Sequence, residues 1–72
     1  MNDLQYIGDK QIESGYRMVL WRKGEYTYEI EFTAHRCPSV LLTDTEYYDA
    51  VAEFEKLHAA KVAEVQAKWT NK

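Results

Sequence analysis

The residue types most typical of catalysis and metal binding meet once in the chain, in the run His35-Arg36-Cys37. A Cys–His pair can act as a nucleophile when the imidazole keeps the thiol ionised inside a cleft. A zinc site needs four ligands, or three and a water, whereas this chain has one cysteine, and its other histidine, His58, lies far along the sequence. We therefore expect a loop histidine and an unreactive thiol, with no catalytic residue, no metal site and no cofactor.

Carboxylates are the second group capable of chemistry, and they are concentrated in the middle of the chain. Between Glu25 and Glu55 there are eight acidic residues and one base, Arg36, although the whole chain carries a net charge of only −3. Paired carboxylates need a cleft that separates their pKa values before they can work as acid and base, and a 72-residue domain has little room for one. The acidic block argues against direct nucleic-acid binding. It favours docking on a basic protein surface, with a merely solvated acidic face as the alternative.

We expect the partner-binding residues to be the acids of one strand and of the start of one helix, joined by an exposed tryptophan. Trp21 lies beside Val19 on the predicted polar face of the sheet, and tryptophan is a frequent interface anchor. The alternative is that the N-terminal segment folds over these two residues. This hypothesis requires the carboxylates to form one continuous outward-facing patch. The full set is Glu25, Glu29, Glu31, Asp44, Glu46, Asp49, Glu53 and Trp21.

Three segments have the pattern of strands. Residues 25–34 alternate aromatic or aliphatic side chains with polar ones, which predicts a half-buried strand. Residues 16–22 predict a second strand, and the short apolar segment 40–42 that follows Pro38 predicts a third. Residues 1–14 fit either a small strand and turn or one helical turn.

The turn at Lys23-Gly24 leaves two possible registers for the hairpin. A two-residue turn pairs Trp21 with Tyr26, and a three-residue turn with a left-handed glycine pairs Trp21 with Glu25. We favour the second register, because it places the even-numbered residues of both strands on one face. It also sets Arg17 opposite Glu29, which is a favourable cross-strand charge pair.

Residues 44–69 predict one long helix, because no Gly or Pro interrupts them and apolar residues recur at steps of three and four. Thr43 and Glu46 have the spacing of a capping box. Such a helix is about 39 Å long, whereas strands of six to eight residues reach about 20–27 Å. The C-terminal turns should therefore overhang the sheet with Val62, Val65 and Trp69 on the core-facing stripe. These three residues predict a possible homodimer.

The elements together predict one α+β domain over residues 1–72, in which a small antiparallel sheet, made of a β-hairpin and a short third strand, packs against one long C-terminal helix. A single cysteine allows no internal disulfide, which favours a reducing, cytoplasmic setting. Residues 1–6 lack the basic start and apolar run of a signal peptide. The longest apolar run, residues 18–21, is too short to span a membrane.

The layout of residues 16–69, an acidic hairpin sheet followed by a long helix, resembles small phage-encoded inhibitors such as anti-CRISPR and other host-takeover proteins. Members of this group share no diagnostic motif, so the resemblance assigns no residue a role. It implies a stoichiometric inhibitor in the cytoplasm of the host cell. Its acidic side chains would occupy the Lys/Arg surface that the target uses for nucleic acid.

Overall fold

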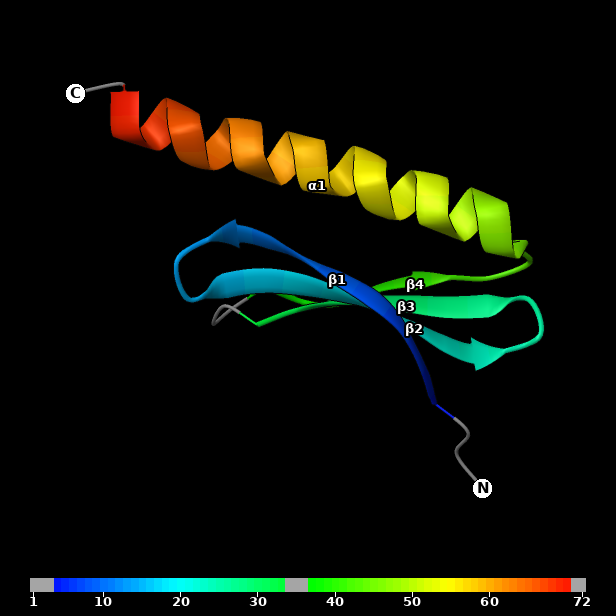
Figure 1. Ribbon diagram of the computed structural model, residues 1–72. Helices are drawn as coiled ribbons and strands as arrows, with labels where there is room; N and C mark the ends of the chain where they lie inside the picture. Colours follow the sequence, from blue (N-terminus) through cyan, green and yellow to red (C-terminus); the bar gives the residue numbers. More distant parts are fainter. Residues whose placement is uncertain (1–3, 34–36, 71–72) are drawn as a thin grey trace.

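The computed structural model describes residues 4–33 and 37–70, with the side chains described as far as residue 68. The elements follow the chain as four strands and one helix: β1 (Gln5–Glu13), β2 (Tyr16–Gly24), β3 (Thr27–Phe32), β4 (Val40–Leu42) and α1 (Tyr47–Thr70). The antiparallel sheet forms one layer, and α1 crosses one of its faces as the second layer (Figure 1). The predicted α+β class, with a sheet against one C-terminal helix, is confirmed.

The N-terminal segment is a full strand at the edge of the sheet, which is ordered β1-β2-β3-β4. A turn at Ser14-Gly15, where Gly15 has a φ of +76°, joins β1 to β2. A register shift between Tyr6 and Gly8 breaks the alternation of β1. As a result Ile7 and Ile12 both pack on the core, although five positions separate them and a regular strand would point them to opposite faces.

The β2–β3 hairpin has neither of the two registers expected from the sequence. Trp21 pairs with Glu29, and the strands continue to Gly24 and Thr27, where a bulge and the turn at Glu25-Tyr26 close the hairpin. The expected pairing of Arg17 with Glu29 is therefore wrong. The predicted division of faces is nevertheless correct in the strands, because the observed register differs from the favoured one by an even number of residues.

One side of the sheet and one side of α1 supply the core. Its buried members alternate along β2 and β3 and are joined by one residue of β1 and two of α1. They are Ile12, Met18, Leu20, Tyr28, Ile30, Phe32, Ala50 and Phe54. Phe32, near the end of β3, is also covered by Lys61 of α1, whose Nζ lies 5.3 Å from the ring centroid.

Helix α1 begins at Tyr47, three residues later than the expected start at Asp44. The first helical bond runs from the N–H of Ala50 to the carbonyl of Glu46 at 2.9 Å, so Glu46 is the N-cap. Asp44 has a φ of +53°, a left-handed conformation that cannot lie inside a helix. The predicted capping box is therefore wrong. Instead, the N–H of Thr45 bonds to the carbonyl of Tyr26 at 2.9 Å, which ties the helix start to the β2–β3 turn.

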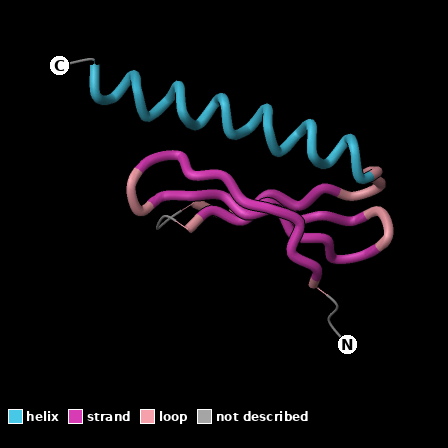
Figure 2. Tube along the Cα trace, viewed as in Figure 1, coloured by secondary structure: helices cyan, strands magenta, loops and turns pink. Residues whose placement is uncertain are grey.

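The C-terminal turns of α1 extend past the β1–β2 turn (Figure 2). Because β1 and β2 have nine residues each, the sheet reaches further along the helix than strands of six to eight residues would. Val62 and Val65 are half-buried and pack on the core of their own chain. The core of their own chain thus covers part of each side chain, and self-association through them stays a prediction; the side chain of Trp69 lies outside the described residues.

Val62→Ala and Val65→Ala are expected to destabilise the folded chain by about 1 kcal/mol each, since each removes part of a half-buried side chain. Urea denaturation measures this loss. Light scattering of each variant should give the same mass as wild type. A variant that lost mass while keeping its stability would instead place these residues in an interface between copies.

Tyr28 is fully buried, and among the described residues its hydroxyl has no hydrogen-bond partner. A buried hydroxyl without a partner costs about 1–3 kcal/mol of desolvation. Tyr28→Phe is therefore expected to raise the free energy of unfolding by about 1 kcal/mol. The control Ile30→Ala, on the same strand face, should lower it by about 2–5 kcal/mol. Destabilisation by Tyr28→Phe would show that the hydroxyl is bonded in solution.

Candidate functional site

The face of the sheet that α1 leaves uncovered carries a row of four side chains, one from each strand. Tyr6 of β1 pairs with Trp21 of β2, Trp21 with Glu29 of β3, and Glu29 with Leu41 of β4. We call this surface the open face. Tyr6 is 55% exposed and Leu41 57% exposed. The open face therefore presents apolar side chains to solvent at both ends of the row and a carboxylate between them.

Trp21 is held in place on the open face by two neighbours. Its ring makes a T-shaped contact with Tyr6, with centroids 5.9 Å apart. Its Nε1–H donates to the Glu31 Oε1 at 2.8 Å. The N-terminal strand thus lies beside Trp21 and leaves the indole half-exposed. A tryptophan fixed in one orientation loses little conformational entropy on binding, which suits an interface anchor.

Two ion pairs lie on the same face. Arg17 Nη1 donates to Asp9 Oδ2 at 3.0 Å, and Lys23 Nζ lies 3.6 Å from Glu29 Oε1. Both pairs are substantially exposed, so each contributes about 0–1 kcal/mol. They neutralise part of the negative charge that the sequence places here, but they leave it accessible to a partner.

The other predicted acids lie in a different layer, so the expected single continuous patch is wrong. Glu31 shares the open face with Glu29, because β3 turns its even-numbered residues to the core. The remaining acids are in the β2–β3 turn (Glu25), in the β4–α1 connection (Asp44) and at the beginning of α1, namely Glu46, Asp49 and Glu53. The sheet separates the helix acids from Glu29 and Glu31.

The helix acids nevertheless lie on the flank of α1 away from β1, which is the flank on the β4 side of the sheet. The Nε2–H of His58 donates to the Gln11 carbonyl of β1 at 2.9 Å, so His58 marks the β1 side of the helix. Glu53 precedes it by five positions, about 140° around the helix. Glu64 lies three turns after Glu53 on the same flank, and its charge contributes to raising the pKa of Tyr16, which contacts Cys37 shortly before β4. We call Glu46, Asp49 and Glu53 the acidic flank.

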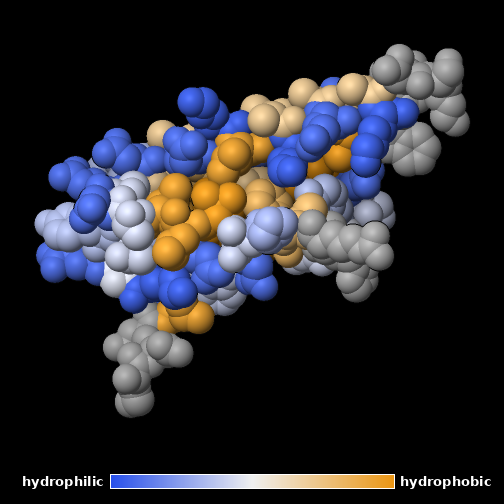
Figure 3. Space-filling view, turned by 180° about the vertical axis from the view of Figure 1, so that it is seen from behind, coloured by the Kyte–Doolittle hydropathy of each residue, from blue (hydrophilic) through white to orange (hydrophobic). Residues whose placement is uncertain are grey.

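Between the two sets of acids lies the apolar strand β4. The view from behind shows hydrophobic side chains gathered between the helix and the sheet, bordered by hydrophilic ones (Figure 3). Val40 and Leu42 are half-buried against the core, and Leu41 is exposed on the open face. From Cys37 to Glu55 the sequence contains five acids and no Lys, Arg or His. β4 is therefore an apolar edge with carboxylates on both sides.

The cysteine lies in a protected position. The Tyr16 hydroxyl is 3.4 Å from Cys37 Sγ, and burial, followed by the contact with this thiol, raises the pKa of Tyr16 to about 12. Tyr16 is thus neutral at physiological pH. His35 lies outside the described residues. Within the described part of the chain no three His, Cys, Asp or Glu side chains come together to hold a metal ion.

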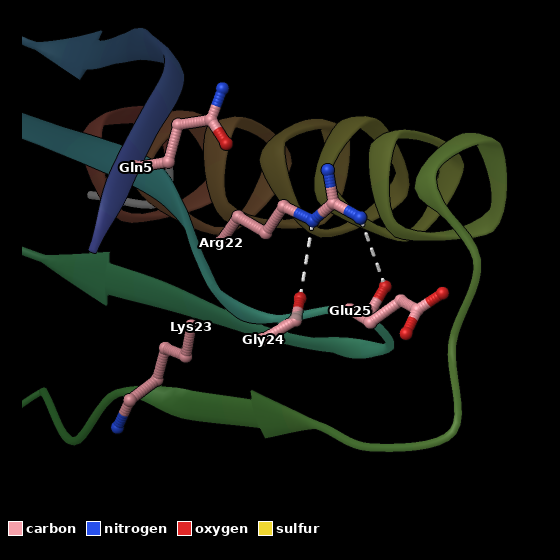
Figure 4. A pocket seen from close by; sticks show the side chains of 5 residues that line it. All are labelled: Gln5, Arg22, Lys23, Gly24 and Glu25. Carbon is pink, nitrogen blue, oxygen red and sulfur yellow. Dashed lines mark hydrogen bonds between the residues drawn. The ribbon is translucent and has the colours of Figure 1, made fainter. Parts of the chain in front are cut away.

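A shallow hollow of about 280 Å³ at the β2–β3 turn is not a ligand site (Figure 4). Gln5, Arg22 and Glu25 line it, and Lys23 points away from Arg22. The guanidinium of Arg22 already donates to the carbonyls of Gly24 at 3.1 Å and Glu25 at 3.2 Å. Arg22 therefore stabilises the turn, and its charge is not directed at a bound anion.

Because the pKa of Tyr16 is raised, the stability of the fold decreases with rising pH in the alkaline range. The folded state holds the phenolic proton more tightly than the unfolded state, so this stabilisation is complete below about pH 10 and is lost as the pH rises towards 12. Tyr16→Phe should reduce the loss of stability between pH 10 and 12 by up to about 1 kcal/mol, since water screens this half-buried group. Urea denaturation at pH 8, 10 and 11.5 measures the difference. Parallel curves for wild type and variant would contradict it.

No known protein family matches the sequence, and no curated protein or solved structure is significantly similar to it. None of the helices among the described residues has the length and apolar character needed to cross a lipid bilayer. The candidate site is therefore defined only by the chemistry of its own residues. It consists of the open face, β4 and the acidic flank, and it presents an apolar edge with a fixed tryptophan nearby and carboxylates on both sides.

Proposed function

We propose that the chain is a non-enzymatic module that binds a partner protein through a basic surface of that partner. The observation that carries this proposal is the placement of acids from two layers around one apolar strand. Glu29 and Glu31 lie on the open-face side of β4, and the acidic flank lies on the other side. A partner with Lys or Arg side chains meets opposite charge on both sides of the strand.

The two kinds of group have different tasks in such a complex. Exposed carboxylates accelerate encounter and select against acidic partners, but they add little net affinity. Leu41 and Trp21 offer apolar area that loses water on contact, which is the usual source of affinity at the centre of an interface. The combination supports selective capture of a basic protein surface.

A surface that a protein uses for nucleic acid is rich in Lys and Arg and is therefore a basic surface of this kind. Together with the resemblance in layout to phage-encoded inhibitors, this favours a stoichiometric inhibitor that competes with the nucleic acid for the same Lys and Arg side chains. Such an inhibitor needs neither a cofactor nor contact with the nucleic acid itself.

Glu53→Lys and Glu55→Lys form a matched pair that tests the proposal. Both residues lie in α1 at nearly the same distance from its start, but Glu53 belongs to the acidic flank and Glu55 points to the opposite side. The immobilised chain is used to capture proteins from a cell extract, and the affinity for the captured protein is then measured at 150 mM salt. At this salt concentration charges are screened beyond about 8 Å, so a charge on one side of the helix has little effect on a partner bound at the other side.

We expect Glu53→Lys to weaken binding about tenfold, equivalent to about 1.4 kcal/mol, and Glu55→Lys to change it less than twofold. Circular dichroism of both variants checks that α1 is intact. Trp21→Ala should weaken binding further at any salt concentration. Equal affinity of the two charge variants, or affinity independent of salt, would remove the acidic surface from the function.

A further inference from the structure

We infer that the partner supplies an extended segment carrying Lys or Arg, and that this segment adds to the sheet as a fifth strand along the free edge of β4. The inference rests on the proposed function and specifies how the partner is bound. It concerns the backbone of β4 and not only the charges around it, so it can fail while the proposed function holds.

Within the described part of the chain, the outer edge of β4 has no strand paired with it. The sheet order places β3 on one side of β4 and no strand on the other. In an antiparallel ladder about half of the N–H and C=O groups of an edge strand point away from the sheet. An extended peptide can satisfy them, while its alternate side chains reach the two faces of the sheet. At β4 those two faces carry Glu29 and Glu31 on one side and the acidic flank on the other.

The other edge of the sheet is a poorer template. β1 has two register shifts, between Tyr6 and Gly8 and between Gln11 and Glu13, and it carries Lys10 within the strand. Bulges and lysines are the features that discourage strand addition at an edge. β4 has no register shift against β3 and no charged residue. The structure thus protects one edge and leaves the other regular and apolar.

A second copy of the chain is a poor occupant of this edge. Pairing β4 with β4 would bring together two segments, each of which carries five acids and no base from Cys37 to Glu55. Like charges opposed across a new interface are destabilising. A strand with basic side chains meets the same carboxylates as opposite charges. Charge complementarity therefore selects a basic segment over self-pairing.

The probe for this inference is the capped hexapeptide Arg-Arg-Val-Val-Arg-Arg, which as a strand presents Arg on both faces. It is titrated into the ¹⁵N-labelled full chain and followed by amide chemical shifts. We expect saturable shifts centred on residues 39–43 and on the acidic flank. The same peptide with N-methyl groups on its four central residues keeps the charge but cannot complete the ladder, so it should bind at least tenfold more weakly. The same peptide with Glu in place of each Arg should not bind.

Leu41→Lys and Gln11→Lys are the matched variants, since each adds one positive charge at an exposed strand position, the first on β4 and the second on β1. Leu41→Lys should weaken peptide binding at least tenfold and Gln11→Lys by less than threefold. Light scattering of the wild-type chain should give a monomer. A dimer that Leu41→Lys dissociates would assign the edge to a second copy and overturn the inference.

Two further results would overturn strand addition. One is equal binding of the N-methylated and unmodified peptides, which would reduce the contact to surface charge. The other is the absence of saturable shifts at millimolar peptide. In either case, continued sensitivity of the captured protein to Glu53→Lys would leave the proposed function standing. If instead the peptide binds at β4 but Glu53→Lys leaves binding of the captured protein unchanged, the proposed function would fail although the edge accepts a strand.

Discussion

The burial of alternate residues of β3 beneath α1 is the constraint on which the rest of the molecule depends. Tyr28, Ile30 and Phe32 form the centre of the core, and a strand has a side-chain period of two. Their burial therefore forces Glu29 and Glu31 onto the face away from the helix. The same packing sets the rotation of α1, because Ala50 and Phe54 must point at the sheet, and this turns Glu53 to one flank.

The parts of the fold that could be predicted are those with a complete local signal. The alternation in residues 25–34 and the spacing of apolar residues in 44–69 each indicate which side is buried. Both elements exist, with the bounds Thr27–Phe32 and Tyr47–Thr70, and residue 34 lies outside the described residues. The predicted short strand at Val40–Leu42 has the same bounds in the structure. The even-numbered face of the hairpin followed from the same alternation, so Trp21 could be placed outside the core before the pairing was known.

The parts that could not be predicted depend on contacts between distant segments. The bulge in β1 hides its alternation, so Ile7 and Ile12 do not look like residues of one face. The start of α1 is set by a hydrogen bond from the N–H of Thr45 to the carbonyl of Tyr26, and β3 and β4 lie between these two residues in the sequence. A local capping pattern cannot predict such a contact. The site was predicted only as a set of residues. Its acids all fall in the middle of the sequence, and only the layer arrangement shows that the sheet divides them.

Because the sheet divides the acids, the short edge strand β4 has carboxylates on both sides. A three-residue strand can offer only a few backbone hydrogen bonds, each worth a net 0.5–1.5 kcal/mol or so, which is less than the cost of immobilising a partner. Carboxylates alone would bind any basic surface weakly and without register. In the complex that we infer, the two would act on the same segment: the ladder would fix its register, and the acids of both layers would require it to be basic. Selectivity would then follow from the arrangement, because each contribution is weak or unselective without the other.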